Sequence, residues 1–177
     1  IINPSKNDTI LEIGPGHGAL TKELLSLSKK VYAVEIDPML CTQLNNQYKQ
    51  LKLFNDDILK WDEGDIQFDK IVGNIPYNIS SQIIFKFLNK NWSVMVLMLQ
   101  KELAKRIVSK EGSKEYGRIS VMAQIFCDIS YMFDISKNVF HPKPKIESGI
   151  LLFKRKKTSV DITKFSIFIK EAFKQRR

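Results

Sequence analysis

The nine residues Gly73–Ser81, with the sequence GNIPYNISS, have the groups needed to hold and activate an amine on a planar ring. Asn74 offers a side-chain carbonyl, and the peptide carbonyl of Ile75 offers a second hydrogen-bond acceptor. Two acceptors aimed at an exocyclic amine hold both of its hydrogens, which frees the nitrogen lone pair from the ring to attack an electrophilic methyl group. Pro76 stiffens the turn, and Tyr77 presents an aromatic face on which an extruded base can stack.

The same stretch has a plainer interpretation as a turn without chemistry. Asn-Ile-Pro-Tyr-Asn is rich in turn-forming residues, and Ser80 could cap the helix that follows. The residues at the neighbouring strand ends distinguish the two interpretations. A catalytic turn needs a cofactor-binding site beside it, whereas a plain turn does not.

A glycine-rich turn is predicted in LEIGPGHGAL, residues 11–20, between a strand and the start of a helix. Gly14 permits the tight turn, and Gly16 lets the backbone approach a ligand. Glu35 follows at about the distance where a carboxylate accepts hydrogen bonds from ribose hydroxyls. The order Gly14-x-Gly16-x-x-Ala19 also fits the dinucleotide fingerprint, so an NAD-binding domain stays open, as does a turn without a ligand.

Asp57 favours a different adenosine-bearing ligand. It follows the third predicted strand, where a carboxylate oxygen can accept from an adenine amino group, whereas its neighbour Asp56 is interpreted as a solvated residue. Because the carboxyl ends of parallel strands share one edge, Gly14, Glu35, Asp57 and Asn74 are expected to form one row. This acidic lining suits a cationic cofactor better than a pyrophosphate.

Apolar runs alternate with helical patterns along the chain, which predicts an α/β fold with a mostly parallel sheet and helices on both faces. Strands are expected at 9–13, 30–36, 51–54, 68–72, 93–99, 129–133 and 149–153, and helices at 19–27, 38–48, 81–89, 101–108, 116–127 and 161–177. The run SVMVLML at 93–99 predicts burial on both faces. The last two strands should form an antiparallel edge. The last helix should present one apolar face, formed by Phe165, Phe168, Ile169, Ala172 and Phe173.

The composition narrows the classes of partner. The 177 residues carry a formal net charge of +9, with an isoelectric point near 9.5, and such an excess attracts polyanions such as RNA. No apolar run approaches the length of a membrane span. Cys41 and Cys127 are interpreted as small core side chains, and His17 and His141 lack companions at ligand spacing, so no metal site is expected.

Seven blocks of the sequence together resemble the KsgA-type rRNA adenine dimethyltransferases: EIGPGHGALT, EID, NDDIL, NIPYNIS, LMLQKELAKRI, GSKEYGRISVMAQ and VFHPKPKIESGILLF. The resemblance covers about residues 9–154, and the Asn-Ile-Pro-Tyr block is typical of amino-methylating enzymes. It implies a class I S-adenosylmethionine-dependent methyltransferase fold, which is Rossmann-like and has a seven-stranded sheet with its last strand antiparallel. It also implies N6,N6-dimethylation of two adjacent adenosines near the 3′ end of small-subunit rRNA. A cytoplasmic monomer that acts on a pre-ribosomal particle is expected.

The resemblance also assigns roles to residues. It implies that seven residues contact the cofactor: Gly14, Gly16, Glu35, Ile36, Asp57, Ile58 and Asn74. It implies that Asn74 also meets the target amine, that Ile75 and Pro76 belong to the same catalytic turn, and that Tyr77 forms a base-stacking pair with Phe140 of VFHPKP. Five basic side chains are expected to contact RNA: Lys101, Lys105, Arg106, Lys143 and Lys145.

Residues 1–157 are predicted to form the catalytic domain, and residues 158–177 the start of a truncated C-terminal helical domain. Three alternatives stay open. The first is an Erm-type large-subunit rRNA methyltransferase. The second is an NAD-dependent oxidoreductase, for which no Tyr-Lys pair at a convincing spacing is found. The third is a non-catalytic RNA-binding or assembly factor that shares the fold.

Overall fold

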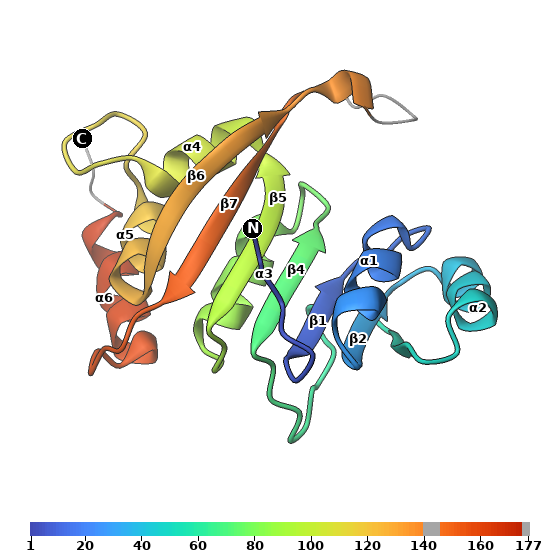
Figure 1. Cartoon of the computed structure of the whole chain (residues 1–177). Helices are drawn as coiled ribbons and strands as arrows, with labels where there is room; N and C mark the ends of the chain where they lie inside the picture. The colour runs from blue at the N-terminus through green and yellow to red at the C-terminus, as the bar shows by residue number, and fades with distance from the viewer. Residues whose placement is uncertain (140–145, 175–177) are drawn as a thin grey trace.

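The computed structural model describes residues 1–139 and 146–174 and contains a seven-stranded sheet in the order β3-β2-β1-β4-β5-β7-β6 (Figure 1). The strands are β1 (Thr9–Ile13), β2 (Lys30–Glu35), β3 (Lys52–Asn55), β4 (Lys70–Asn74), β5 (Val94–Gln100), β6 (Cys127–Ile135) and β7 (Ser148–Arg155). The helices are α1 (Ala19–Leu27), α2 (Pro38–Gln47), α3 (Ser80–Leu88), α4 (Lys101–Val108), α5 (Arg118–Phe126) and α6 (Ile162–Ala172), with a 3-10 turn η1 (Lys137–Val139). None of these described helices is long and apolar enough to cross a membrane.

The sheet is mixed, as the sequence predicts. Strands β1 to β5 pair in parallel, whereas β7 is antiparallel to both of its neighbours, β5 and β6. The strand order reverses beside β1, because the chain adds β2 and β3 on one side and returns to add β4 on the other. Gly14 after β1 and Asn74 at the end of β4 therefore flank the switch point, where open α/β sheets bind their ligands.

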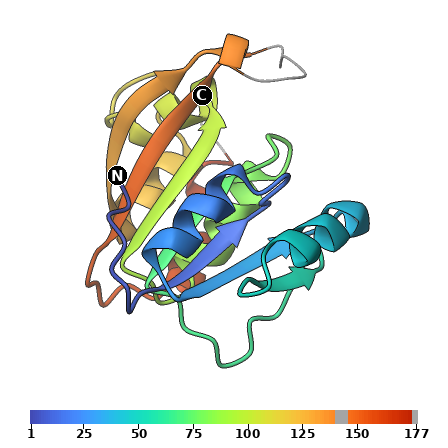
Figure 2. The same ribbon diagram turned by 45° about the vertical axis from the view of Figure 1, so that its right-hand side comes forward.

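Helices cover both faces of the sheet (Figures 1 and 2). On one face, Ile10 of β1 packs in a cluster with Leu24 of α1 and Leu44 of α2. On the other face, Leu11 and Ile13 belong to a larger cluster that takes residues from α3, α4, α5 and α6. The alternation of side chains along β1 thus divides the apolar core into two layers.

Strand β5 is less buried than its sequence predicts. Alternate side chains are fully buried against the larger cluster: Met95, Leu97 and Leu99. The side chains between them are only partly covered: Val94, Val96 and Met98. The prediction of burial on both faces is wrong here, because the helices on the second face, α1 and α2, contact β2 and β3.

Strand β4 begins at Lys70 rather than at Phe68. The Phe68 ring instead joins an aromatic group before the strand, with its centroid 5.6 Å from that of Tyr32 and 6.0 Å from that of Trp61. Phe68 is apolar because it packs in the core before the strand begins. The sequence pattern does not distinguish such a residue from an apolar residue inside a strand.

Helix α6 packs against α5. Asp161 caps its start, because the carboxylate accepts from the backbone nitrogens of Thr163 and Lys164. The ring of Phe165 lies edge-on to that of Phe126, with centroids 6.2 Å apart. Phe168 and Ala172 are predicted to lie on the apolar face, but Phe168 is 65% exposed and Ala172 is also exposed, so that part of the prediction is wrong. The covered stripe is formed by Ile162, Phe165, Ile169 and Phe173. The domain division at residues 157 and 158 stays a prediction.

Candidate functional site

The ends of β1, β2 and β4 and the turn after β3 meet around one cavity at the carboxyl edge of the sheet. Six of the seven predicted cofactor contacts line it: Gly14, Glu35, Ile36, Asp57, Ile58 and Asn74. The seventh, Gly16, is joined to this group because its backbone nitrogen donates to Oε2 of Glu35. The row that the sequence predicts from separate strand ends is therefore one continuous surface.

The turn after β1 lies close to the end of β4. A Cβ atom added at Gly14 would lie 3.7 Å from the backbone oxygen of Asn74, so the two segments are near van der Waals contact. Gly18, which the sequence analysis does not single out, has φ of +82° and lies against α2 and the residue after it. A Cβ there would come within 2.8 Å of the side chains of Leu44 and Tyr48, so this glycine lets α1 begin where it does.

Glu35 has hydrogen-bonding capacity to spare. The residue is 7% exposed, and its two carboxylate oxygens accept from the backbone nitrogens of Gly16, at 3.1 Å, and Asp37, at 3.0 Å. An ionised carboxylate accepts about four hydrogen bonds, so each oxygen keeps room for another donor. Two neighbouring hydroxyl groups, as on a ribose, fit this remaining capacity.

Two further carboxylates line the cavity after β3. Oδ1 of Asp57 accepts from the nitrogen of Leu59 at 2.9 Å, and Oδ1 of Asp56 accepts from the nitrogen of Asp57 at 2.7 Å. Asp56 is exposed, as its interpretation as a solvated residue predicts. It also lines the cavity, which that interpretation does not predict. Within the described ranges, no group of three His, Cys, Asp or Glu side chains could hold a metal ion. The acidic wall therefore favours a cationic organic ligand.

The turn after β4 contains the groups proposed to hold an amine. Asn74 pairs with Met98 of β5, and the residue lines the cavity. Ile75 is buried at 1% exposure and anchors the turn in the core. Across residues 1–139 and 146–174, no hydrogen bond occupies the side-chain amide of Asn74 or the carbonyl of Ile75.

Helix α3 begins differently from the plainer interpretation of this stretch. Ser80 is the first helical residue and Ile79 is the N-cap, without a side-chain cap. The hydroxyl of Ser80 donates to the carbonyl of Pro76 at 3.0 Å, and the nitrogen of Ile79 donates to the same oxygen at 3.3 Å. Ser80 thus closes the turn and does not cap the helix.

Tyr77 is half-buried, and its hydroxyl lies 2.8 Å from Oγ of Ser148 at the start of β7. Among the described residues that line the cavity, Pro76 is present and Tyr77 is not. The hydroxyl of Tyr77 is therefore anchored to β7. Phe140, its predicted stacking partner, lies outside the described residues.

A family model described as ribosomal RNA adenine dimethylase matches residues 1–177. The chain belongs to this family. It is 45% identical to ribosomal RNA small subunit methyltransferase A of Malacoplasma penetrans, over 97% of this chain and 65% of that protein. A protein of the same name from Coxiella burnetii is 41% identical, over 99% of this chain and 73% of that protein. The chain thus spans about two thirds to three quarters of the length of these relatives.

Solved structures agree with this membership. A dimethyladenosine transferase from Plasmodium falciparum superposes with a TM-score of 0.92 at 30% identity, over 99% of this chain and 66% of that one. The 23S rRNA methyltransferase ErmE superposes with a TM-score of 0.78 at 25% identity, over 96% of this chain and 71% of that one. The resemblance and the class I methyltransferase fold that the sequence predicts are confirmed.

The basic residues predicted to contact RNA differ in their surroundings. Nζ of Lys101 lies 2.7 Å from Oδ2 of Asp134 and 2.6 Å from Oε2 of Glu147. These carboxylates raise the pKa of Lys101 and tie the start of α4 to β6 and to the residue before β7. Lys105 and Arg106 are exposed on α4. Their contact with RNA stays a prediction, and the remaining two residues, Lys143 and Lys145, lie outside the described residues.

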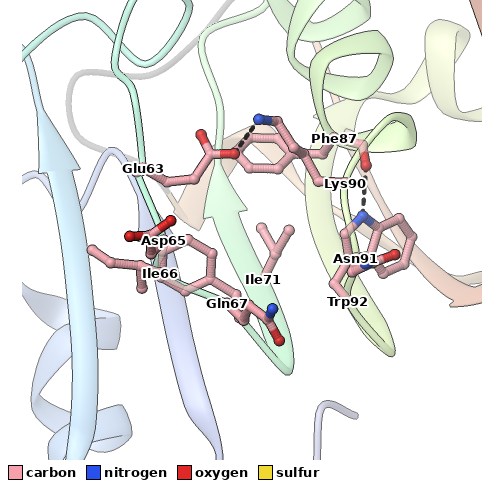
Figure 3. Close-up of a pocket in the computed structure, with 11 residues that line it drawn as sticks. Glu63, Asp65, Ile66, Gln67, Ile71, Phe87, Lys90, Asn91 and Trp92 are labelled. Atoms are coloured by element: carbon pink, nitrogen blue, oxygen red, sulfur yellow. Dashed lines mark hydrogen bonds and ion pairs between the residues drawn. The ribbon is translucent and has the colours of Figure 1, made fainter.

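A second cavity lies at the opposite edge of the sheet, before β4 and β5 (Figure 3). Glu63 and Lys90 form an ion pair at its rim, and Nε1 of Trp92 donates to the carbonyl of Phe87 at 2.6 Å. None of the predicted cofactor or amine-binding residues lines this cavity. The candidate site is therefore the cavity at the carboxyl edge.

Proposed function

We propose that this protein transfers methyl groups from S-adenosylmethionine to the N6 amine of adenosine in small-subunit rRNA. The products are two adjacent N6,N6-dimethyladenosines near the 3′ end of that RNA. The observation that carries the proposal is the shared cavity, in which the glycine turn at Gly14 and the acceptor residue Asn74 adjoin each other. The names of the relatives support rRNA as the substrate and adenine as the base.

The cavity fits S-adenosylmethionine better than a dinucleotide. The ribose hydroxyls match the free acceptor capacity of Glu35, and Asp57, which lines the same cavity, would accept from the adenine amine. Ile36 and Ile58 add apolar surface on which an adenine ring can lie. Three carboxylates, the third being Asp56, would repel a pyrophosphate, whereas they attract a sulfonium ion. This argues against the NAD-dependent alternative.

The cofactor supplies the chemistry of an electrophilic methyl group on a positively charged sulfur. Asn74 accepts one hydrogen of the target amine through its side-chain oxygen, and Ile75 accepts the other through its peptide oxygen. This geometry favours a tetrahedral nitrogen, whose lone pair would form the new N–C bond as the bond between the methyl carbon and sulfur breaks and S-adenosylhomocysteine leaves. The amine proton leaves for water after the attack, so no strong base is needed, and positioning supplies most of the acceleration.

The second transfer uses the same groups. A monomethylated amine keeps one hydrogen, so a single acceptor suffices to orient it. A base inside a duplex cannot reach the cavity, so the target adenine must be extruded. Tyr77 supplies the face on which the extruded adenine stacks. The short turn that joins Asn74 to Tyr77 would let both residues act on the same base.

The large-subunit alternative has less support. ErmE shares the fold, but it superposes less closely than the dimethyladenosine transferase does. The curated relatives quoted above, at 41% and 45% identity, carry small-subunit names. The non-catalytic alternative is disfavoured because Asn74, Ile75, Pro76 and Tyr77 are all present, and no described residue bonds to the side-chain amide of Asn74 or the carbonyl of Ile75. We further infer that the protein acts as a monomer on a pre-ribosomal particle in the cytoplasm.

Labelled S-adenosylmethionine and undermethylated small ribosomal subunits provide the direct test. Mapping of the modified nucleotides should find two adjacent adenosines near the 3′ end, each with two methyl groups. Large subunits are incubated in parallel. Methylation of the large subunit alone would favour the Erm-type alternative, and RNA binding without transfer to either subunit would favour the non-catalytic one.

A further inference from the structure

A hydrogen bond joins the proposed stacking residue to a strand far along the chain. Oη of Tyr77 and Oγ of Ser148 are 2.8 Å apart, although 71 residues separate them in sequence. Ser148 is fully buried, and a buried hydroxyl group costs free energy unless it is hydrogen-bonded. The contact therefore contributes to the placement of both side chains.

The topology explains how Ser148 reaches the turn after β4. β7 runs antiparallel to β5, so its first residue lies beside the last residue of β5, and Ser148 pairs with Gln100 (Figure 1). The start of β7 is thus brought to the same edge of the sheet as the carboxyl ends of β4 and β5. Tyr77 extends past the end of β5 to meet it.

The backbone on either side of Ser148 is held in place. On one side, the carbonyl of Glu147 accepts from the nitrogen of Lys101 at 3.0 Å, and its carboxylate pairs with the ammonium group of the same lysine. On the other side, a Cβ at Gly149 would lie 2.6 Å from the hydroxyl of Tyr131, so the two segments are closely packed. Ser148 has little freedom to follow Tyr77 if the ring moves.

We propose that Ser148 is a positioning residue that fixes the ring of Tyr77 for stacking against the target adenine. The inference rests on the proposed function and adds a residue to it. A tyrosine anchored only by its backbone can rotate about its side-chain bonds, and a base gains little from a face that moves. A hydroxyl anchor at the far end of the ring fixes its plane before the base arrives, which lowers the ordering cost of stacking. Ser148 acts through Tyr77 and does not touch the base.

The test removes the same hydrogen bond from both ends, with Ser148→Ala, Tyr77→Phe and the double variant. The purified protein is bound to a small-subunit rRNA fragment that carries 2-aminopurine at a target adenosine, and methyl transfer to the unmodified fragment is measured in parallel. Stacking on an aromatic ring quenches 2-aminopurine, so the saturated complex of either single variant should be brighter than that of the wild type. Each single variant should lower kcat/KM by about 10-fold, which is typical of one lost hydrogen bond, while the affinity for S-adenosylmethionine stays unchanged.

The double variant decides between positioning and independent roles. If loss of the bond between Ser148 and Tyr77 causes the defect of both single variants, the double variant should be no less active than the more impaired single variant. The second substitution then removes no further interaction. An additive loss of about 100-fold, or emission from the Ser148→Ala complex equal to that of the wild type, would overturn the proposal.

A matched control separates positioning from stability. Ser28→Ala removes another buried hydroxyl, which donates to the carbonyl of Asp8 at 2.6 Å before β2, at the opposite edge of the sheet. It should lower stability without changing the emission of the bound probe. If the wild type binds the fragment but transfers no methyl group, the proposed function fails, and the coupling of Ser148 and Tyr77 is then measured from the emission and the affinity of the probe.

Discussion

The carboxylate of Glu35 lies 3.1 Å from the backbone nitrogen of Gly16, so the acid at the end of β2 and the glycine turn after β1 form one hydrogen-bonded unit. The same carboxylate also accepts from the backbone nitrogen of Asp37, which begins the turn into α2. A single buried side chain thus organises two of the turns around the cavity.

Glu35→Gln should weaken the binding of S-adenosylmethionine. The amide places an NH₂ group where an acceptor is needed, and hydrogen bonds to charged groups contribute about 1.5–3 kcal/mol, so the affinity should fall by on the order of 10- to 100-fold. Isothermal titration calorimetry measures the change directly. Glu23→Gln, on the exposed face of α1, is the control, and an unchanged affinity in Glu35→Gln would contradict the assignment.

Asn74→Ala should severely reduce methyl transfer while RNA binding is largely retained. The variant loses an acceptor that acts on the amine as it becomes tetrahedral, and loss of one such group typically lowers kcat by about 10²- to 10³-fold. Single-turnover transfer to undermethylated small subunits measures the step. Asn45→Ala on the exposed side of α2 should be indistinguishable from the wild type. Normal turnover by Asn74→Ala would rule out its role.

Glu12 should make the stability of the protein depend on pH. The side chain is 2% exposed, and burial raises its pKa to about 7, with the nearby charge of Glu35 adding to the effect and a hydrogen bond from Thr21 opposing it. Between an unfolded pKa of about 4.5 and this folded value, the folded protein binds more protons than the unfolded chain, so stability falls as pH rises through this window. One pKa unit corresponds to about 1.4 kcal/mol, so the full effect is on the order of 3 kcal/mol.

Glu12→Gln should flatten this dependence. The amide stays neutral and can still bond to Thr21, so the thermal midpoint of the variant should change less between pH 5 and 8 than that of the wild type. Glu23→Gln again serves as the control, because it removes an exposed carboxylate. Parallel pH profiles for the wild type and Glu12→Gln would show that Glu12 does not titrate in this range.

Lys101 and its neighbours on α4 should respond differently to mutation. Lys105→Ala and Arg106→Ala each remove an exposed charge, so each should weaken RNA binding and reduce the salt dependence by about one phosphate contact. Lys101→Met instead breaks the ion pairs to Asp134 and Glu147, so it should lower the thermal midpoint and leave the salt slope unchanged. Binding titrations over a range of salt concentrations distinguish the two outcomes. A reduced slope for Lys101→Met would instead support its predicted role in RNA binding.

Gly18→Ala should destabilise the fold more than Gly16→Ala does. Both positions have positive φ, but the added Cβ at Gly18 would press on Leu44 and Tyr48, whereas no atom lies within 4 Å of one at Gly16. Strain and overlap together predict a loss of about 2–4 kcal/mol at Gly18, against about 1 kcal/mol from strain alone at Gly16. Urea denaturation of both variants measures the difference. Equal losses would mean that α2 yields to the added methyl group.

The order of elements and the row of residues that line the cavity could be predicted from the sequence, because both depend on local patterns. Strand and helix periodicities specify where each strand ends, and parallel strands bring their carboxyl ends to one edge. Gly14, Glu35, Asp57 and Asn74 each follow or end a strand, so their meeting in one cavity needed no further information.

Contacts between distant segments were decided only by the tertiary structure. Which face of β5 is covered depends on where α1 and α2 lie, and the exposure of Phe168 depends on how α6 lies on α5. Ser148 carries no signal of its own in the sequence, since a serine at the start of a strand is common. Its bond to Tyr77 exists because an antiparallel β7 brings its first residue to the end of β5, and a local pattern contains no information on which distant hydroxyl will arrive there.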